Sequence, residues 1–244
     1  MDAREALNAG FAFYESGKLE EAKACWRNAW ELRDRTPEAA QSAAAAAGNL
    51  GVLFEQTGNV EQAARWYQNA WELRDTTPEA AQYAAIAAYN LGLLFKQTGD
   101  VEQAACWYQN AWELRDTTPE AAQSAAIAAY NLGGLFAQTG DVEQAARWYQ
   151  NAWELRDKTP KAAQSAARAA FNLGALFAQT GNVEQAARWY QNAWELRDRA
   201  PEAAQYATAA AYNLGVLFEQ TGNVEQAARW YQNAWELRDT TPEA

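Results

Sequence analysis

One tripeptide, Asn-Leu-Gly, recurs along this chain every 41 residues. Its first residues are Asn49, Asn90, Asn131, Asn172 and Asn213. Asn8-Ala9-Gly10 lies one period earlier, and prolines keep the same spacing from Pro37 to Pro242. A fixed period of this length predicts stacked repeats rather than the one or two globular domains that 244 residues would otherwise suggest. Residues 1–244 are therefore expected to form one array, with repeats at about 1–36, 37–77, 78–118, 119–159, 160–200 and 201–241. Thr241-Pro242-Glu243-Ala244 matches the start of a seventh repeat.

Each repeat carries the signals of two helices. In the third repeat, Thr77-Pro78-Glu79 combines a capping side chain, a proline suited to the first turn and an acid that complements the helix dipole. This predicts a first helix over 78–97, about 30 Å long. Thr98-Gly99-Asp100 ends it, and the aspartate caps a second helix over about 101–115 that closes on a basic residue. Because no segment alternates with the period of a strand, the predicted fold class is all-α.

The second helix of each repeat is apolar on more than one side. In the third repeat its apolar side is formed by Val101, Ala104, Tyr108, Ala111 and Leu114. A helix this apolar is expected to be buried between neighbours. The chain has twelve tryptophans, two in each second helix. We interpret them as packing residues, with stacking on a sugar or cofactor as the minor alternative.

A glycine stands within each first helix, where it costs ~1 kcal/mol relative to alanine. These residues are Gly10, Gly51, Gly92, Gly133, Gly174 and Gly215. We expect each of them to allow a close approach between the two helices of its repeat.

Charge and composition argue against several classes of function. A net charge of −11 with a pI near 4.6 disfavours nucleic acids and anionic membranes as partners. The chain has no histidine, no nucleophile–base pair and no phosphate-cradling glycine loop, so we expect no catalytic residue, no metal and no cofactor. No apolar run approaches the ~18 residues of a membrane span, and no signal peptide is visible, so a cytoplasmic location is expected. Cys25 and Cys106, two repeats apart, are expected to be unpaired.

The second to sixth repeats share a longer pattern of Asn-Leu-Gly, Phe, a glycine turn, Ala, Tyr and Ala, and the first repeat follows it with Ala9 and Trp26 at two positions. In the third repeat these residues are Asn90, Leu91, Gly92, Phe95, Gly99, Ala104, Tyr108 and Ala111. The pattern closely resembles the tetratricopeptide repeat, and the resemblance covers essentially the whole chain. The family's usual period is 34 residues, and its proline after the second helix is here displaced into the next helix start. Both departures resemble the longer-period branch that includes the kinesin light chains.

The resemblance implies a right-handed α-solenoid superhelix of six helix pairs. It also implies that an extended peptide or partner segment binds in a concave groove lined by the first helix of each repeat. Helical repeats that read RNA base by base have a similar period but are basic, so the acidic charge argues against them.

The repeats differ from one another mainly along one stripe of the first helix. Four positions, spaced i, i+3, i+7 and i+10, vary between repeats. In the second to sixth repeats, position i holds Ala45, Ile86, Ile127, Arg168 and Ala209, and position i+3 holds Gly48, Tyr89, Tyr130, Phe171 and Tyr212. Position i+7 holds Val52, Leu93, Gly134, Ala175 and Val216, and position i+10 holds Glu55, Lys96, Ala137, Ala178 and Glu219. That spacing places them on one face of a helix. The second helices barely vary, although they are also solvated on one face. A variable stripe on a nearly constant scaffold favours a ligand-binding face, with drift or engineered tuning as the alternative.

The repeated asparagine lies on the same stripe. Its amide offers both a donor and an acceptor, so a ladder of such amides can pair with the backbone of an extended peptide. The alternative is a structural ladder that joins adjacent first helices. The full set of predicted peptide-binding residues is Asn8, Asn49, Asn90, Asn131, Asn172, Asn213, Tyr89, Tyr130, Phe171, Tyr212, Arg168, Lys96, Gly134 and Ala175.

The fourth and fifth repeats carry small residues on this stripe. Gly134 and Ala175 stand where the second, third and sixth repeats have valine or leucine, and aromatic residues border them. We expect a hollow here that holds the bulkiest side chain of the peptide. Arg168 is expected to favour an acidic residue nearby.

The leading functional hypothesis is a protein-interaction module. The alternative is a structural scaffold, engineered or newly amplified, without a natural ligand, and an enzyme is the least favoured class. The last second helix exposes Trp230, Tyr231 and Trp235 with no helix after it. End-to-end self-association through this uncapped repeat is therefore expected.

Overall fold

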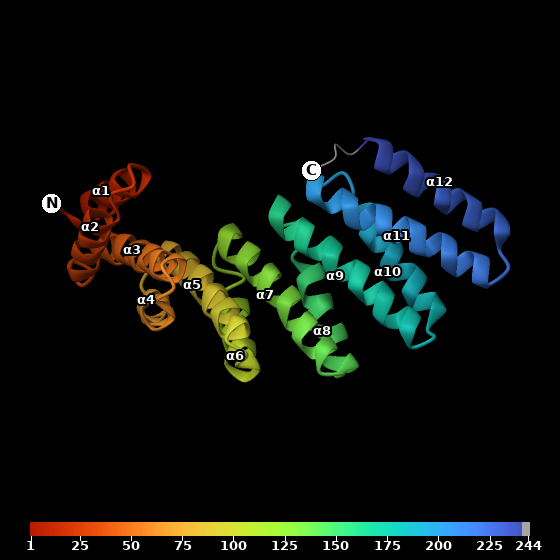
Figure 1. The fold of residues 1–244 in the computed structure, drawn as a ribbon, viewed down its shortest axis with the longest axis horizontal. Coiled ribbons are helices and arrows are strands. Elements are labelled where there is room, and N and C mark those ends of the chain that lie inside the picture. The colour runs from red at the N-terminus through yellow and green to blue at the C-terminus, as the bar shows by residue number, and fades with distance from the viewer. Residues whose placement is uncertain (241–244) are drawn as a thin grey trace. The chain divides into compact units, whose positions relative to one another are not determined.

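A computed structural model describes residues 1–240, except for the side chains of Pro201, Asp239 and Thr240. The expected start of a seventh repeat lies outside the described residues. Within them the chain forms twelve helices and no strand, so the predicted all-α fold is confirmed (Figure 1). The helices are α1 (Ala3–Glu15), α2 (Leu19–Glu31), α3 (Pro37–Gln56), α4 (Val60–Glu72), α5 (Pro78–Gln97), α6 (Val101–Glu113), α7 (Pro119–Gln138), α8 (Val142–Glu154), α9 (Pro160–Gln179), α10 (Val183–Glu195), α11 (Pro201–Gln220) and α12 (Val224–Thr240).

The helices pair as the repeats require, so odd-numbered helices are the first helix of a repeat and even-numbered helices are the second. We call them A helices and B helices. An A helix such as α5 begins where the Thr77 hydroxyl accepts a hydrogen bond from the backbone N–H of Ala80 at 3.0 Å. It ends at a glycine turn in which Gly99 has a φ of +84°, a conformation that favours glycine. The Asp100 carboxylate then accepts from the N–H of Gln103 at 3.0 Å and starts α6.

The predicted end of the B helix is wrong by about two residues. Helix α6 ends at Glu113, and a turn follows it. Arg115 therefore does not sit in the last helical turn, where a cation would complement the helix dipole. Its guanidinium instead donates to the carbonyl oxygen of Trp112 at 3.2 Å and lies 4.7 Å from the centre of that ring. The same arginine over tryptophan recurs at the end of the other B helices.

The chain forms two compact units, Met1–Ala128 and Ala129–Ala244, and each is described by itself. In the first unit, α1, α3 and α5 contact their own B helices, and each of α2 and α4 also contacts the following A helix. Adjacent A helices touch as well, α1 with α3 and α3 with α5. The second unit repeats this scheme with α8 to α12. Helix α7 contributes its first ten residues to the first unit and the rest to the second.

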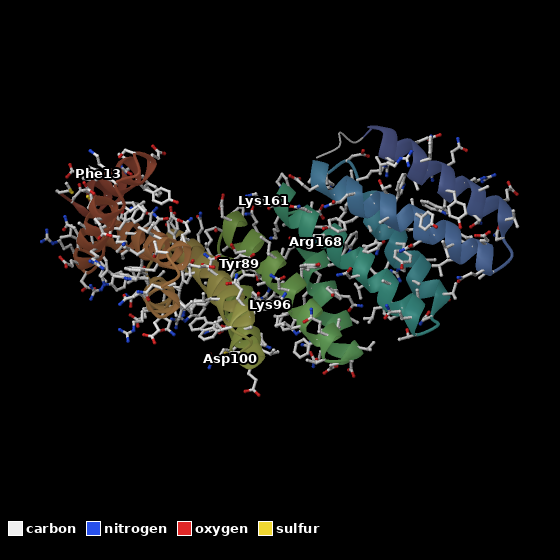
Figure 2. The ribbon with its side chains drawn as sticks, viewed as in Figure 1. Phe13, Tyr89, Lys96, Asp100, Lys161 and Arg168 are labelled. Atoms are coloured by element: carbon white, nitrogen blue, oxygen red, sulfur yellow. The ribbon has the colours of Figure 1, made fainter. Side chains whose placement is uncertain are left out.

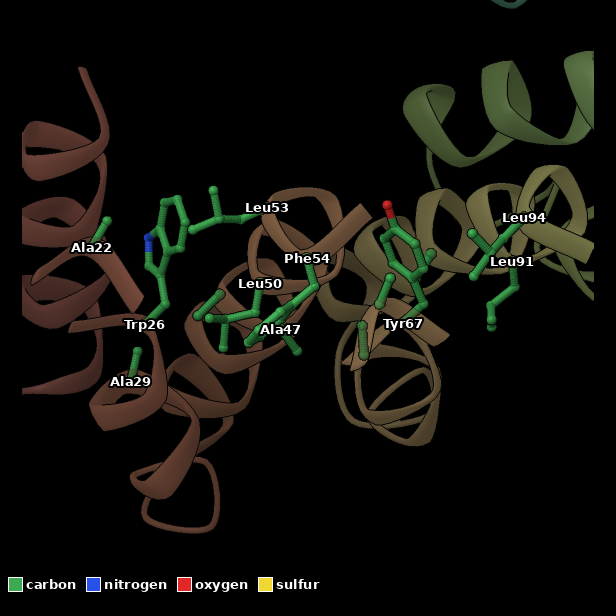
Figure 3. Close-up of a cluster of buried hydrophobic side chains, with 14 of the residues drawn as sticks. Ala22, Trp26, Ala29, Ala47, Leu50, Leu53, Phe54, Tyr67, Leu91 and Leu94 are labelled. Atoms are coloured by element: carbon green, nitrogen blue, oxygen red, sulfur yellow. The ribbon is translucent and has the colours of Figure 1, made fainter. Parts of the chain in front are cut away.

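The core of the first unit is built from alanines and leucines of the A helices, which pack against alanines and one large ring of each B helix (Figure 3). A Cβ atom placed on Gly92 would lie 2.4 Å from Cδ1 of Tyr108. The equivalent glycines of the other repeats meet a ring at similarly short distances. The expected close approach at these glycines is therefore confirmed, and it offsets their cost within a helix.

The tryptophans join one repeat to the next. Within the first unit, Trp30 meets Trp66 edge-to-face with ring centres 6.0 Å apart, and Trp71 meets Trp107 at 5.9 Å. Within the second unit, the pairs Trp153–Trp189 and Trp194–Trp230 have the same geometry. Edge-to-face pairs of this kind are favourable. The packing interpretation of these tryptophans is confirmed.

The B helix is buried over a narrower face than the sequence suggested. Ala104, Tyr108 and Ala111 of α6 are fully buried, whereas Val101 is 44% exposed. The valine lies in the first turn of the helix, next to the glycine turn, where neighbouring helices do not reach. The same valine is exposed in all the B helices that carry it.

Candidate binding site

The variable face of the A helices, defined by the four sets of positions above together with the repeated asparagines, is called the A-helix stripe. The first unit holds five of the predicted binding residues: Asn8, Asn49, Tyr89, Asn90 and Lys96. The second unit holds the other nine: Tyr130, Asn131, Gly134, Arg168, Phe171, Asn172, Ala175, Tyr212 and Asn213. The stripe of the second unit comes from the end of α7 and from α9 and α11.

The aromatic residues of the stripe lean on the B helix of their own repeat. Ring centres are 5.9 Å apart for Tyr130 and Tyr149, and 5.8 Å for Phe171 and Tyr190. Tyr149 and Tyr190 thus lie against a stripe ring as well as against the glycine of the A helix. Tyr212 keeps 57% of its surface exposed, so its ring is open to a partner.

One of the repeated asparagines has a structural partner that the sequence did not suggest. The amide of Asn172 donates to the hydroxyl of Tyr149, in the preceding B helix, at 3.3 Å. Asn90 and Asn213 lie near Tyr67 and Tyr190 in the same relationship and lower the pKa values of these tyrosines slightly against the effect of burial. The bond runs from a B helix to the next A helix and not between adjacent A helices. It anchors the amide of Asn172 without excluding a second bond to a peptide, because an amide has further donors and acceptors.

Asn49 shows what happens when that partner is missing. Its preceding B helix carries Trp26 in place of the tyrosine, and the indole N–H donates to the carbonyl of Leu7 at 3.3 Å. The side-chain nitrogen of Asn49 is consequently buried without a hydrogen-bond partner among the described residues. A buried unpaired amide is costly, so this repeat is a weak point of the first unit.

Arg168 is one of two basic residues at its repeat position, the other being Arg4 of the first repeat, and aromatic rings hold it. Its guanidinium carbon lies 4.3 Å from the ring centre of Tyr130 and 5.5 Å from that of Tyr206. One guanidinium nitrogen donates to the hydroxyl of Tyr130 at 3.2 Å, while Nε is buried with no partner. No ion pair in the described part of the chain includes Arg168. A positioned cation therefore lacks a counter-ion in a protein whose net charge is −11.

A second cation lies on the same helix. Lys161, in the first turn of α9, replaces the glutamate that four other A helices carry. Figure 2 shows Lys161 and Arg168 on this helix. A lysine in the first turn opposes the helix dipole, and α9 has no acidic residue there to offset it. Basic charge is therefore concentrated along this part of the stripe.

The small residues of the fourth and fifth repeats leave space beside the B-helix tyrosines. A Cβ atom on Gly134 would meet only the hydroxyl of Tyr149, at 3.8 Å. In the second repeat, by contrast, Glu55 reaches across and accepts a hydrogen bond from the hydroxyl of Tyr67 at 2.7 Å. Ala137 takes the place of that glutamate in the fourth repeat and cannot do so. A Cβ atom is thus tolerated at Gly134, and the hollow that the sequence predicts around it stays a prediction.

Burial, together with hydrogen bonds to glutamates of the A helix, raises the pKa values of the B-helix tyrosines. Burial is the main reason that the pKa of Tyr67 lies above its ordinary value of 10.0, and the bond to Glu55 adds to the effect. Burial likewise raises the pKa values of Tyr108, Tyr149 and Tyr190. For Tyr231 the hydrogen bond to Glu219 is the larger cause, and the pKa rises to about 12.

Two cavities of the structure were not predicted. One of about 590 Å³ lies among α1, α3 and α5, where Arg4, Asn8, Ser42 and Tyr83 are among the lining residues. The other, of about 750 Å³, lies among α9, α11 and α12. Ser42 and Tyr83 extend the variable stripe toward the helix starts, and this signal could have identified the first cavity.

The described residues contain no cluster of acidic residues and cysteines able to hold a metal ion. None of the helices described is both long and apolar enough to cross a membrane.

Comparison with protein families gives three matches, all described as tetratricopeptide repeat, at residues 7–79, 124–199 and 210–244. These cover most of the chain, and the chain belongs to the tetratricopeptide repeat family. A comparison with curated proteins finds no match.

Solved structures of similar fold span the chain at low sequence identity. BtubC (BKLC) from P. vanneervenii is 21% identical with a TM-score of 0.60, and the match covers 91% of this chain and 93% of that one. RapI in its apo form is 12% identical with a TM-score of 0.56 and 97% coverage of both chains. PilF of Pseudomonas aeruginosa is 20% identical with a TM-score of 0.55, covering 98% of this chain and 93% of its own. At such identity these relatives share the fold.

Proposed function

We propose that this chain is a protein-interaction module that binds an extended segment of a partner protein along the A-helix stripe of its second unit. The tetratricopeptide fold generally mediates protein–protein interaction and is generally non-catalytic, which supports the class of function. The observation that carries the choice of site is Arg168, a cation that two tyrosine rings hold without a carboxylate partner.

The residues around Arg168 indicate the chemistry of the partner segment. The open position at Gly134 lies beside the half-buried Tyr130, and small residues follow in the next repeat. Aromatic walls with a small-residue floor suit an apolar or aromatic side chain. The guanidinium of Arg168 suits a carboxylate next to that side chain. Asn131 and Asn172 would contact the backbone of the segment.

Selection from a display library of random peptides tests this proposal. We expect enrichment of peptides that place an acidic residue near an aromatic or large apolar one. Gly134→Leu with Ala175→Leu should abolish binding of the selected peptides, since both side chains fill the open space. Gly134→Ala is the matched control, because one methyl group makes only an ordinary contact there.

Arg168→Ala should remove the preference for the acidic residue, while Lys96→Ala, in the first unit, should not. Helix content by circular dichroism verifies that each variant folds. A library selection that enriches no sequence would favour a structural scaffold without a ligand. Enriched peptides whose affinity is unchanged by the Gly134, Ala175 and Arg168 substitutions would place the site elsewhere.

A further inference from the structure

The two basic residues of α9 lie on one face of the helix. Lys161 and Arg168 are the only basic residues on α7, α9 and α11, the A helices that supply the A-helix stripe of the second unit. Lys161 precedes Arg168 by seven residues, which is close to two full turns. Their side chains therefore leave the same face of α9 about 10 Å apart. A partner segment that lies along α9 at Arg168 comes within reach of a second cation.

The lysine carries a cost that the fold does not offset. Its side chain is exposed, and no ion pair in the described part of the chain includes it. This holds also for Glu202, the acidic residue at the equivalent position of the neighbouring helix α11, which forms no ion pair with Lys161. Because a cation in the first turn opposes the helix dipole, Lys161 lowers the stability of α9. A residue with this cost and without an ionic partner is a candidate for contact with a ligand.

Arginines in the turns before α9 and α11 differ from Lys161, because an aspartate neutralises them. Asp157 lies 2.9 Å from a guanidinium nitrogen of Arg199 and 3.6 Å from one of Arg156. Lys158 lies in the turn before α9 begins, so it is outside the A-helix stripe. The unneutralised positive charge on the stripe of this unit is therefore that of Lys161 and Arg168.

The face of α9 changes in character along its length. From the helix start it presents Lys161, then Arg168, and seven residues later Ala175. The rings of Tyr130 and Tyr206 hold the guanidinium between these two ends. An extended segment advances about 3.3 Å per residue, so 10 Å corresponds to about three residues. The acidic residue proposed at Arg168 would thus stand between an apolar residue on one side and a residue facing Lys161 on the other.

We infer that Lys161 binds a second carboxylate of the partner segment, from an aspartate or glutamate about three residues beyond the one at Arg168 and on the side away from the apolar residue. The inference rests on the proposed function, because it concerns the same site and the same segment. The two cations act differently. The ammonium group of a lysine on a flexible stem selects for charge, whereas the guanidinium held by two rings also selects for position.

A second peptide library tests this inference. It keeps the acidic residue and the apolar or aromatic residue of a peptide selected as described above, and it randomises the residues on both sides of that pair. Selection on the parent chain should enrich aspartate or glutamate about two to four residues beyond the fixed acid, away from the fixed apolar residue. Selection on Lys161→Glu should lose this enrichment and favour lysine or arginine instead. The variant should fold, because four other A helices carry glutamate there.

Fluorescence anisotropy with the peptide enriched on the parent chain measures the size of the effect. Lys161→Glu should weaken binding about threefold to tenfold, since it turns an exposed ion pair into a pair of like charges. Raising the ionic strength from about 0.05 M to about 0.5 M should reduce that difference. Arg188→Glu is the matched control, because it makes the same change of charge at an exposed position of α10 and should leave the affinity unchanged.

The two proposals fail in different ways. An affinity that Lys161→Glu leaves unchanged while Arg168→Ala lowers it would overturn this inference and leave the proposed function standing. Enrichment of acidic residues only on the apolar side of the fixed acid would do the same. An affinity that Arg168→Ala also leaves unchanged would overturn both. Circular dichroism verifies that each variant folds.

Discussion

The ring of Tyr67 lies directly against Gly51: a Cβ atom on that glycine would be 2.4 Å from both Cδ1 and Cε1 of the ring. Gly48, one helical turn earlier on α3, has no atom within 4 Å of the same added Cβ. Two glycines of one helix therefore face opposite constraints. The first is required by the packing of the repeat, and the second is only a cost to the helix.

Gly51→Ala should destabilise the chain, whereas Gly48→Ala should stabilise it. Overpacking against Tyr67 exceeds the gain of ~1 kcal/mol in helix propensity, leaving a net loss of about 1–2 kcal/mol. At Gly48 the gain of up to ~1 kcal/mol is unopposed. Urea denaturation midpoints of the two variants and the parent chain check this. Equal shifts of the same sign would show that Tyr67 does not pack as described.

Asn172→Ala should cost more than Asn49→Ala. The first leaves the buried hydroxyl of Tyr149 without its donor, while the second removes an amide nitrogen that already lacks a partner. Both substitutions raise helix propensity by a similar amount. The difference between their losses of unfolding free energy therefore measures the hydrogen bond, about 1–2 kcal/mol. Thermal midpoints measured in parallel give this difference. If Asn49→Ala were the more destabilising, the amide of Asn49 would have a partner.

Alkaline pH should unfold the chain cooperatively. The pKa values of Tyr67, Tyr108, Tyr149 and Tyr190 are raised in the fold, chiefly by burial, from an ordinary value of 10.0. Below about pH 10 these tyrosines are protonated in both states, so their contribution is fully present. Above it the unfolded state loses protons first, and stability falls as pH rises toward the folded pKa values.

Absorbance at 295 nm, which reports tyrosinate, should therefore rise together with the loss of helical circular dichroism. Tyr67→Phe removes one of the shifted groups and should flatten the fall of stability with pH. Tyr212→Phe, on an exposed ring, is its control. Smooth ionisation of all tyrosines near pH 10 in a folded chain would contradict the burial described.

Two thiols per chain should react without reduction. Cys25 is half-buried and Cys106 is exposed, and neither forms a disulfide. A thiol assay on denatured, unreduced protein should count two. In the native protein Cys106 should react faster, and Cys106→Arg, the residue that four other repeats carry at this position, should remove the fast phase. A count below two would indicate a bridge that the structure does not contain.

Much of the fold could be predicted because its signals are local. Helix α5 starts after Thr77 and ends before the glycine turn, as its capping residues and proline indicate. The B-helix end could not be placed as well, because Arg115 interacts with the Trp112 ring rather than with the helix dipole, and this depends on side-chain packing.

The candidate site was predictable only in part. The variable stripe identified Arg168 and the open position at Gly134, since both differ from the residues of the adjacent repeats. The bond between Asn172 and Tyr149 was missed, because the two residues lie on different helices and are 23 residues apart in the sequence.

The sequence by itself determined the period, the helix pairs and the family, because capping, turn chemistry and repeat register act within one repeat. Only the tertiary structure decided which groups meet across repeats. The bond from Asn172 to Tyr149, the rings that hold Arg168, and the exposed face of Trp235 all depend on contacts between helices that the chain brings together from a distance. Such contacts leave no local pattern, because near-identical repeats carry the same residues whether or not a neighbouring helix covers them.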